Sequence, residues 1–123
     1  MRISVLGAGS WGTTVAALVC KRHDTLVWSR DPGVAEEINA RHHNQVYLPG
    51  FDLPEALRGS DDLGAAADRA QVLIVGVPSH AFRQVLEAAR DHVPPWIPVV
   101  SLAKGLEDGT HLRRRDRVRA RRR

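Results

Sequence analysis

The chain has 123 residues, a formal net charge of +4 and a single cysteine. This length suits one domain and is short of the two-domain size usual for nucleotide-dependent enzymes, while the lone cysteine excludes a disulfide scaffold. No apolar stretch approaches the roughly 20 residues that span a bilayer, and the first residues predict a strand instead of a signal peptide. We therefore expect a cytoplasmic protein without a membrane segment.

The positive charge is concentrated at the end of the chain. Residues 113–123 contain eight arginines and one aspartate, which leaves a net charge of −3 for residues 1–112. No aromatic residue lies among these arginines, whereas nucleic-acid-binding surfaces interleave cationic and aromatic side chains. We predict a domain at 1–112 followed by a disordered arginine-rich tail. Such a tail binds polyanions nonspecifically, and no specific nucleic-acid partner is expected.

The first predicted element is a strand at residues 2–6, which passes directly into the motif Gly7-x-Gly9-x-x-Gly12. A helix is predicted from Trp11 to about Lys21, so the motif stands at a strand-to-helix turn that is typical of dinucleotide binding. Gly7 permits the tight turn, Gly9 leaves room for a pyrophosphate, and Gly12 lets the helix pack closely on the strand. The anion is expected on the unpaired amides that open the helix. The alternative is an ordinary glycine-rich turn that binds nothing.

Strand and helix patterns continue to alternate beyond this turn. The residues expected on the buried face of the first helix are Val15, Leu18, Val19 and Cys20. Residues 25–28 predict a second strand, and Asp31 is placed to cap the helix that follows, with Pro32 at its first position. On this second helix Val34 and Ile38 fall on one side.

Residues 42–57 contain a Leu-Pro-Gly segment and no helical periodicity, which predicts a loop with at most one helical turn. A loop of this length in a compact domain is usually functional. The later predicted elements are a minimal strand near 60–62, a helix at 65–69, a strand at 72–77, a helix at 81–91 and a strand at 99–102. The alternation predicts an α/β fold with a Rossmann-type parallel sheet of order 3-2-1-4-5.

Ligands of such sheets bind beyond the carboxyl ends of the strands, at the point where the strand order reverses. We therefore expect the segments that follow strands one, two, four and five to form one crevice. These segments are Ser10-Trp11, Ser29-Arg30, Pro78 to Phe82, and Lys104.

Arg30 occupies the position at which dinucleotide domains select their cofactor. An acid about 20 residues beyond the glycines binds the ribose 2′-hydroxyl of NAD, whereas an arginine there takes the 2′-phosphate of NADP. Arg30 is suited to pair with that phosphate or to stack on adenine, and the alternative is a solvated residue before the helix. Since Asp31 is assigned to the helix cap, the sequence leaves both NAD and NADP open as cofactors.

Several other polar or aromatic residues are weaker candidates. The adjacent His42 and His43 do not predict a metal site, because neighbouring side chains diverge and no further ligand stands at the required spacing. His80 is expected either in the cleft wall or simply exposed. Trp11 either covers the cofactor or packs within the helix. Lys104 offers a cation to a phosphorylated or carbonyl substrate, or else is solvated surface.

Four motifs, taken together and in this order, resemble the amino-terminal domain of bacterial NAD(P)-dependent glycerol-3-phosphate dehydrogenase. They are Gly7-Ala-Gly-Ser-Trp-Gly-Thr13, Asn44-Gln-Val-Tyr-Leu-Pro-Gly50, Val77-Pro-Ser-His-Ala-Phe82 and Ser101-Leu-Ala-Lys-Gly-Leu-Glu107. The resemblance covers residues 1 to about 112. It implies reversible hydride transfer between dihydroxyacetone phosphate and sn-glycerol 3-phosphate, with NAD or NADP, in the supply of glycerophospholipid precursors.

The resemblance also implies roles for individual residues. The positions matching Ser10, Trp11, Arg30 and Lys104 contact the cofactor in that family, and Lys104 matches a lysine that also touches substrate. Tyr47 and Phe82 match positions near the cofactor.

The family continues past this point with a helical second domain, which supplies the catalytic lysine and the substrate-phosphate ligands. The arginine-rich segment 113–123 does not resemble that continuation. We therefore expect no catalytic residue here, a chain truncated or frameshifted after about residue 112, and negligible activity on its own. The alternatives are a catalytically silent dinucleotide-binding module and a nonfunctional remnant, either with a polyanion-binding tail. The oligomeric state is left open.

Overall fold

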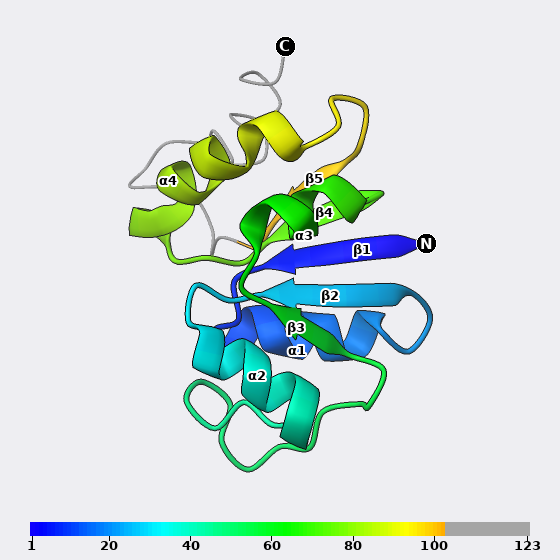
Figure 1. Cartoon of the computed structure of the whole chain (residues 1–123), viewed down its shortest axis with the longest axis vertical. Helices are drawn as coiled ribbons and strands as arrows, with labels where there is room; N and C mark the ends of the chain where they lie inside the picture. Colours follow the sequence, from blue (N-terminus) through cyan, green and yellow to red (C-terminus); the bar gives the residue numbers. More distant parts are fainter. Residues whose placement is uncertain (103–123) are drawn as a thin grey trace.

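A computed structural model describes residues 1–102, in which five strands alternate with helices (Figure 1). In chain order the elements are β1 (Arg2–Leu6), α1 (Ser10–Val19), β2 (Asp24–Trp28), α2 (Pro32–Arg41), β3 (Arg58–Ser60), α3 (Leu63–Arg69), β4 (Val72–Val75), α4 (Ser79–Ala89), the 3₁₀ turn η1 (Arg90–His92) and β5 (Val99–Ser101). The strands form one parallel sheet of order β3-β2-β1-β4-β5, which confirms the predicted Rossmann-type fold. Lys104 and the segment 113–123 lie outside the described residues. None of the described helices is long and apolar enough to cross a membrane.

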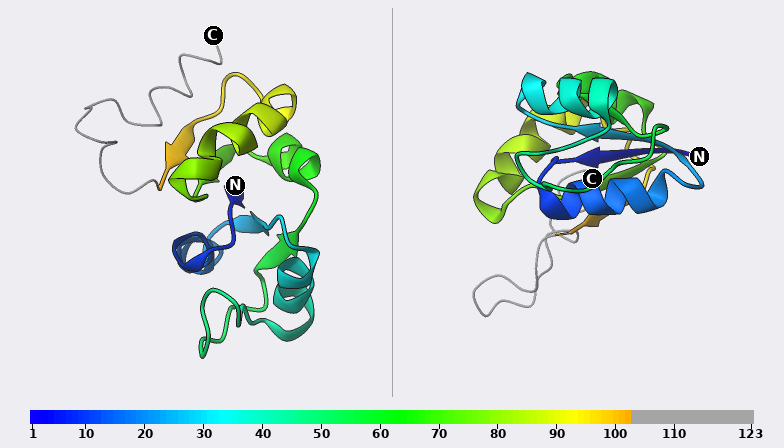
Figure 2. Two further views of the ribbon diagram at one scale, coloured as in Figure 1. Left: turned by 90° about the vertical axis from the view of Figure 1, so that its left-hand side faces the viewer. Right: turned by 90° about the horizontal axis from the view of Figure 1, so that it is seen from below.

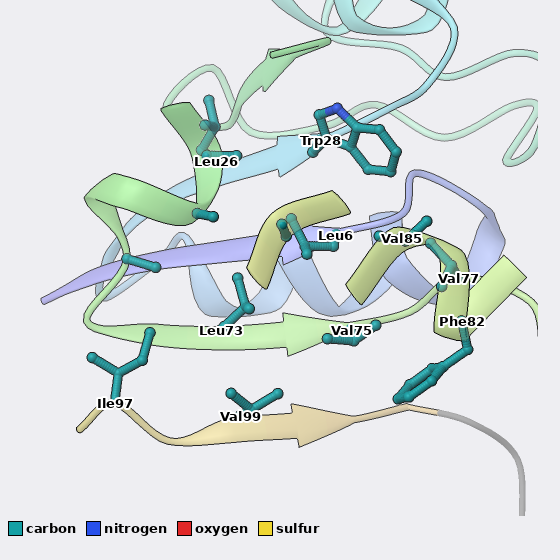
Figure 3. Packing of buried hydrophobic residues seen from close by; sticks show 14 residues of the cluster. Leu6, Leu26, Trp28, Leu73, Val75, Val77, Phe82, Val85, Ile97 and Val99 are labelled. Carbon is teal, nitrogen blue, oxygen red and sulfur yellow. The ribbon is translucent and has the colours of Figure 1, made fainter. Parts of the chain in front are cut away.

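The sheet separates two apolar layers. One layer packs α1 and α2 against the sheet, together with Leu53 and Leu57 from the segment before β3. The other layer packs α3 and α4 against the opposite face, and it includes Leu6, Leu73 and Val85 (Figure 3). In the left view of Figure 2, α3 and α4 lie above β1, whereas α1 and α2 lie below it. Because both faces are covered, the central strands β1 and β4 are apolar along most of their length.

The predicted buried face of α1 is wrong at Leu18, which is 61% exposed. The residues that α1 buries are Gly12, Thr13 and Ala16, and Cys20 just beyond the helix is buried as expected. Small side chains on this face let the helix approach β1 closely, and a pattern of large apolar residues does not detect such a face. Burial raises the pKa of the Cys20 thiol above its ordinary value.

The third strand lies at Arg58–Ser60 instead of 60–62, and it pairs with the carboxyl half of β2. It contains only three residues and no apolar alternation, so periodicity could not locate it. The cap of α2 agrees with the prediction, since Oδ1 of Asp31 accepts a hydrogen bond of 2.8 Å from the amide of Gly33.

An ion-pair network holds the amino-terminal end of the sheet. Oδ1 of Asp24 accepts a 2.8 Å hydrogen bond from Arg58 and lies 3.0 Å from Nη2 of Arg69. Arg69 also donates to the carbonyl of Ile3, which ties α3 to β1. Burial by itself raises the pKa of Asp24. The hydrogen bond from Arg58 and the charges of both arginines lower this pKa by more than burial raises it, so the net shift is downward. This network lies at the end of the sheet opposite the carboxyl ends of the strands.

Candidate functional site

A cleft of about 400 Å³ opens where β1, β2 and β4 end. Its walls come from the turn after β1, the end of β2 with the segment after it, the loop before β3, and the start of α4 (Figure 1). The lining residues are Gly7, Ala8, Gly9, Trp28, Ser29, Arg30, Asp31, Tyr47, Gly76, Val77, Pro78, His80, Ala81 and Val85. The cleft lies between the carboxyl ends of β1 and β4, where the strand order reverses, as expected for a ligand site in a doubly wound sheet.

At two positions of the glycine turn, the backbone is packed so closely that a side chain would not fit. Gly7 has a φ of +114°, and a Cβ there would lie 2.9 Å from the backbone of Gly76. A Cβ on Gly12 would overlap the carbonyl of Gly7, because α1 begins directly against the turn. In contrast, a Cβ on Gly9 would meet nothing within 4 Å. The turn is therefore tight on its protein side and open at Gly9.

Helix α1 begins at this open position without a side-chain cap. Gly9 is the N-cap residue, and its carbonyl accepts the first helical hydrogen bond, 2.9 Å from the amide of Thr13. The amides before Thr13 therefore have no acceptor within the helix, and they lie at the positive end of the helix dipole. This open, uncapped helix start beside a cleft fits the pyrophosphate of a dinucleotide.

The segment after β2 forms the second wall. Oγ of Ser29 accepts from the amide of Asp31 at 3.1 Å, while the Asp31 carboxylate caps α2. Since Asp31 is already engaged at the helix cap, the exposed guanidinium of Arg30 is the charged group at this wall that is suited to a phosphate.

The loop between α2 and β3 contributes a residue that sequence reasoning did not single out. Asn44 is completely buried, and its Nδ2 donates to the carbonyl of Ala8 at 2.8 Å and to Oγ1 of Thr13 at 2.9 Å. Its Oδ1 accepts from the amide of Tyr47 at 3.3 Å. Tyr47 itself is half exposed and lines the cleft. The position of Asn44 in a polar loop motif gave no signal that its side chain turns inward.

The start of α4 forms the third wall, with Pro78, His80 and Ala81. Phe82 does not line the cleft, because its ring is buried in the apolar layer beneath α4. In Figure 3 Phe82 lies at one side of that layer and Trp28 at the other. Trp28 has only 6% of its surface exposed, yet it forms part of the cleft wall.

The structure brings together most, but not all, of the segments expected to converge. Ser29, Arg30, Pro78, His80 and Ala81 share the cleft with the glycine turn and Tyr47. Ser10 and Trp11 are exposed at the start of α1 and are not among the lining residues, with Trp11 68% exposed. Lys104 falls outside residues 1–102.

His42 and His43 both make contacts with residues of the loop that follows α2. His42 ends α2 in the left-handed conformation, and its carbonyl accepts from the amide of Leu53 at 2.8 Å. Nε2 of His43 lies 2.6 Å from Oδ1 of Asp52. Among the described residues, no group of three or more His, Cys, Asp or Glu side chains is placed to hold a metal ion.

Comparison with known proteins agrees with this geometry. The chain is 51% identical over 107 residues to glycerol-3-phosphate dehydrogenase [NAD(P)+] 2 of Sphingopyxis alaskensis, a match that covers 87% of this chain and 32% of the relative. It is 49% identical over 114 residues to glycerol-3-phosphate dehydrogenase [NAD(P)+] of Mycobacterium avium, over 91% of this chain and 33% of that protein. The chain thus spans about a third of the length of these curated relatives.

Among solved structures, the glycerol-3-phosphate dehydrogenase of Coxiella burnetii superposes with a TM-score of 0.82 at 32% identity. That superposition covers 98% of this chain and 37% of the other. The sequence profile described as "NAD-dependent glycerol-3-phosphate dehydrogenase N-terminus" matches residues 2–121, and so extends through most of the arginine-rich segment. The chain belongs to this family of glycerol-3-phosphate dehydrogenase amino-terminal domains, whose cofactor is NAD or NADP.

Proposed function

We propose that this chain is the cofactor-binding part of an enzyme that interconverts dihydroxyacetone phosphate and sn-glycerol 3-phosphate in the cytoplasm. The single observation that carries this proposal is the open helix start at Gly9 beside a cleft of about 400 Å³. The bound cofactor supplies the hydride. In the described part of the chain, the protein's own contribution is to bind and orient the cofactor.

Each wall of the cleft has a distinct task in this proposal. The first amides of α1, at Ser10 and Trp11, donate to the pyrophosphate, while Gly7 and Gly12 keep the turn close to β1. Arg30 lies beside the adenosine ribose, where it neutralises a 2′-phosphate or stacks on the base. Tyr47 covers the mouth of the cleft from the loop side.

The remaining predicted site residues act less directly. Phe82 supports α4 from the apolar layer below, so that Pro78 and His80 face the cleft. Lys104, beyond β5, is proposed to contact both cofactor and substrate.

We further propose that proton transfer, and the substrate contacts other than that of Lys104, belong to the part of the relatives that this chain does not span. Holding two reactants in a reactive geometry can supply about 7–11 kcal/mol of the barrier. We therefore expect negligible turnover of glycerol 3-phosphate by the chain alone. Sustained turnover by a preparation free of host dehydrogenase would contradict this expectation.

Binding is tested by titrating the chain with NADH and NADPH while following tryptophan fluorescence. Trp28 forms part of the cleft wall, whereas Trp96 is 81% exposed and is not among its lining residues. We expect saturable quenching that persists in the Trp96→Phe variant, because Trp28 in the cleft wall and Trp11 at the start of α1 both remain as reporters. A cooperative thermal melt combined with no response to either nucleotide would contradict the proposal.

A further inference from the structure

We propose that Asn44 is a positioning residue for the cofactor, because its side chain holds the glycine turn and the Tyr47 loop in one fixed arrangement. The inference rests on the proposed dinucleotide function of the cleft. Asn44 makes no direct contribution to the cleft wall, and it acts through Ala8 and Tyr47, which do line the cleft.

The orientation of the Asn44 amide follows from its partners. The carbonyl of Ala8 can only accept a hydrogen bond, so the group 2.8 Å from it must be the NH₂. The amide of Tyr47 can only donate, so the group 3.3 Å from it must be the oxygen. Both ends of the side chain are thus assigned by chemistry, and a fully buried amide left without either partner would carry a cost of about 1–3 kcal/mol.

The bond to Ala8 fixes the peptide plane between Ala8 and Gly9. Since C=O and N–H point in opposite directions across a trans peptide, anchoring the Ala8 carbonyl on Asn44 turns the Gly9 amide away from the loop. The second bond, to Oγ1 of Thr13 at 2.9 Å, joins the same side chain to the first turn of α1. Asn44 therefore fixes the peptide before Gly9 and the first turn of α1, the two sides of the helix start that would receive the pyrophosphate.

The bonds on the other side of Asn44 fix the loop. Its Oδ1 accepts from Tyr47, and its own carbonyl accepts from the amide of Leu48 at 2.8 Å. Nothing else among the described contacts joins this part of the loop to the glycine turn through a buried polar group. The placement of Tyr47 at the cleft mouth is thereby coupled to the placement of the turn.

The test compares asparagines that make similar bonds at different places. Asn39 also joins two elements, donating to the carbonyl of Gly59 at 2.9 Å and accepting from its amide at 2.8 Å, but it lies on α2 away from the turn. We expect Asn44→Ala to raise the Kd for NADH at least about tenfold, the consequence of losing buried hydrogen bonds. Asn39→Ala should leave that Kd within about twofold, even where it lowers Tm.

The Asn44→Asp variant separates the hydrogen bond to Ala8 from the hydrogen bond that Tyr47 donates. A carboxylate still accepts from Tyr47 but has no hydrogen to donate to Ala8, so the loop-side bond survives and the turn-side bond is lost. We expect weakened NADH binding in this variant too. An Asn44 variant that folds and binds NADH as tightly as the unmutated chain overturns the inference.

A second measurement needs no substitution. In the unmutated chain, saturating NADH should slow hydrogen exchange at the amides of Tyr47 and Leu48 together with those of the glycine turn. Unchanged exchange at Tyr47 and Leu48 despite NADH binding overturns the coupling that Asn44 is proposed to provide. If the unmutated chain binds neither NADH nor NADPH, the dinucleotide proposal itself fails, which is a distinct result.

Discussion

The carbonyl oxygen of Gly7 occupies the space that a Cβ on Gly12 would need, so no methyl group fits between the turn and α1. The same glycine motif leaves Gly9 open, with nothing within 4 Å of a Cβ. Within one motif, Gly12 therefore allows the helix to pack closely, whereas Gly9 leaves access for a ligand.

Replacing Gly12 with alanine should destabilise the fold. Its Cβ would overlap backbone atoms, so α1 would have to move away from β1 at a cost of about 3 kcal/mol or more. Chemical denaturation followed by circular dichroism measures the loss. A stability within about 0.5 kcal/mol of the parent would show that the helix start can shift freely.

Gly9→Ser should separate ligand binding from stability. The position is extended, with φ −71° and ψ −174°, and is the N-cap of α1, so a serine hydroxyl there would accept from the first helical amides. We expect Tm to be unchanged or higher, because the helix gains a cap. The Kd for NADH should rise at least about tenfold, since the hydroxyl competes with the pyrophosphate for those amides. Unaltered binding would argue against an anion at this helix start.

Arg30→Gln should alter the preference between the two cofactors. If Arg30 pairs with a 2′-phosphate, NADPH loses a charge-assisted hydrogen bond that NADH never had, and we expect about tenfold weaker binding of NADPH alone. Arg41→Gln, in the last turn of α2, is the matched control because it removes the same charge away from the cleft lining. Equal weakening of NADH and NADPH in Arg30→Gln would instead favour stacking on adenine.

The Asp24 network predicts a stability that depends on acid. Because the pKa of Asp24 is lowered in the folded state, its stabilisation is present above its ordinary value of 3.8 and disappears as pH falls through the lower folded value. Asp24→Asn should lower stability at pH 7 by about 1 kcal/mol or less, since the carboxylate is half exposed and screened by solvent. The difference between parent and variant should shrink as pH falls below 3.8. A difference that is constant from pH 7 to pH 2 would exclude the ion pairs as its source.

The sequence was sufficient for the glycine turn, which is a local motif, and for the strand order, which follows from the alternation of strands and helices with right-handed crossovers. Buried runs such as Val72–Val75 and the Asp31 cap are recognised from a few neighbouring residues. The buried face of α1 was misjudged at Leu18 because close packing there favours small residues over large ones. The role of Asn44 depends on partners 31 and 36 positions away, which no local pattern contains.

The loop that carries Tyr47 is closed at its base by two contacts, Leu53 with His42 and Asp52 with His43. Its tip, which includes the exposed Val46, is therefore joined to the rest of the fold by these two contacts and by the buried side chain of Asn44. Lengthening a loop whose ends are already held together costs little free energy, since closure entropy grows only slowly with length. Selection could thus reshape the mouth of the cleft through insertions in this segment while the strands beneath it stay in register.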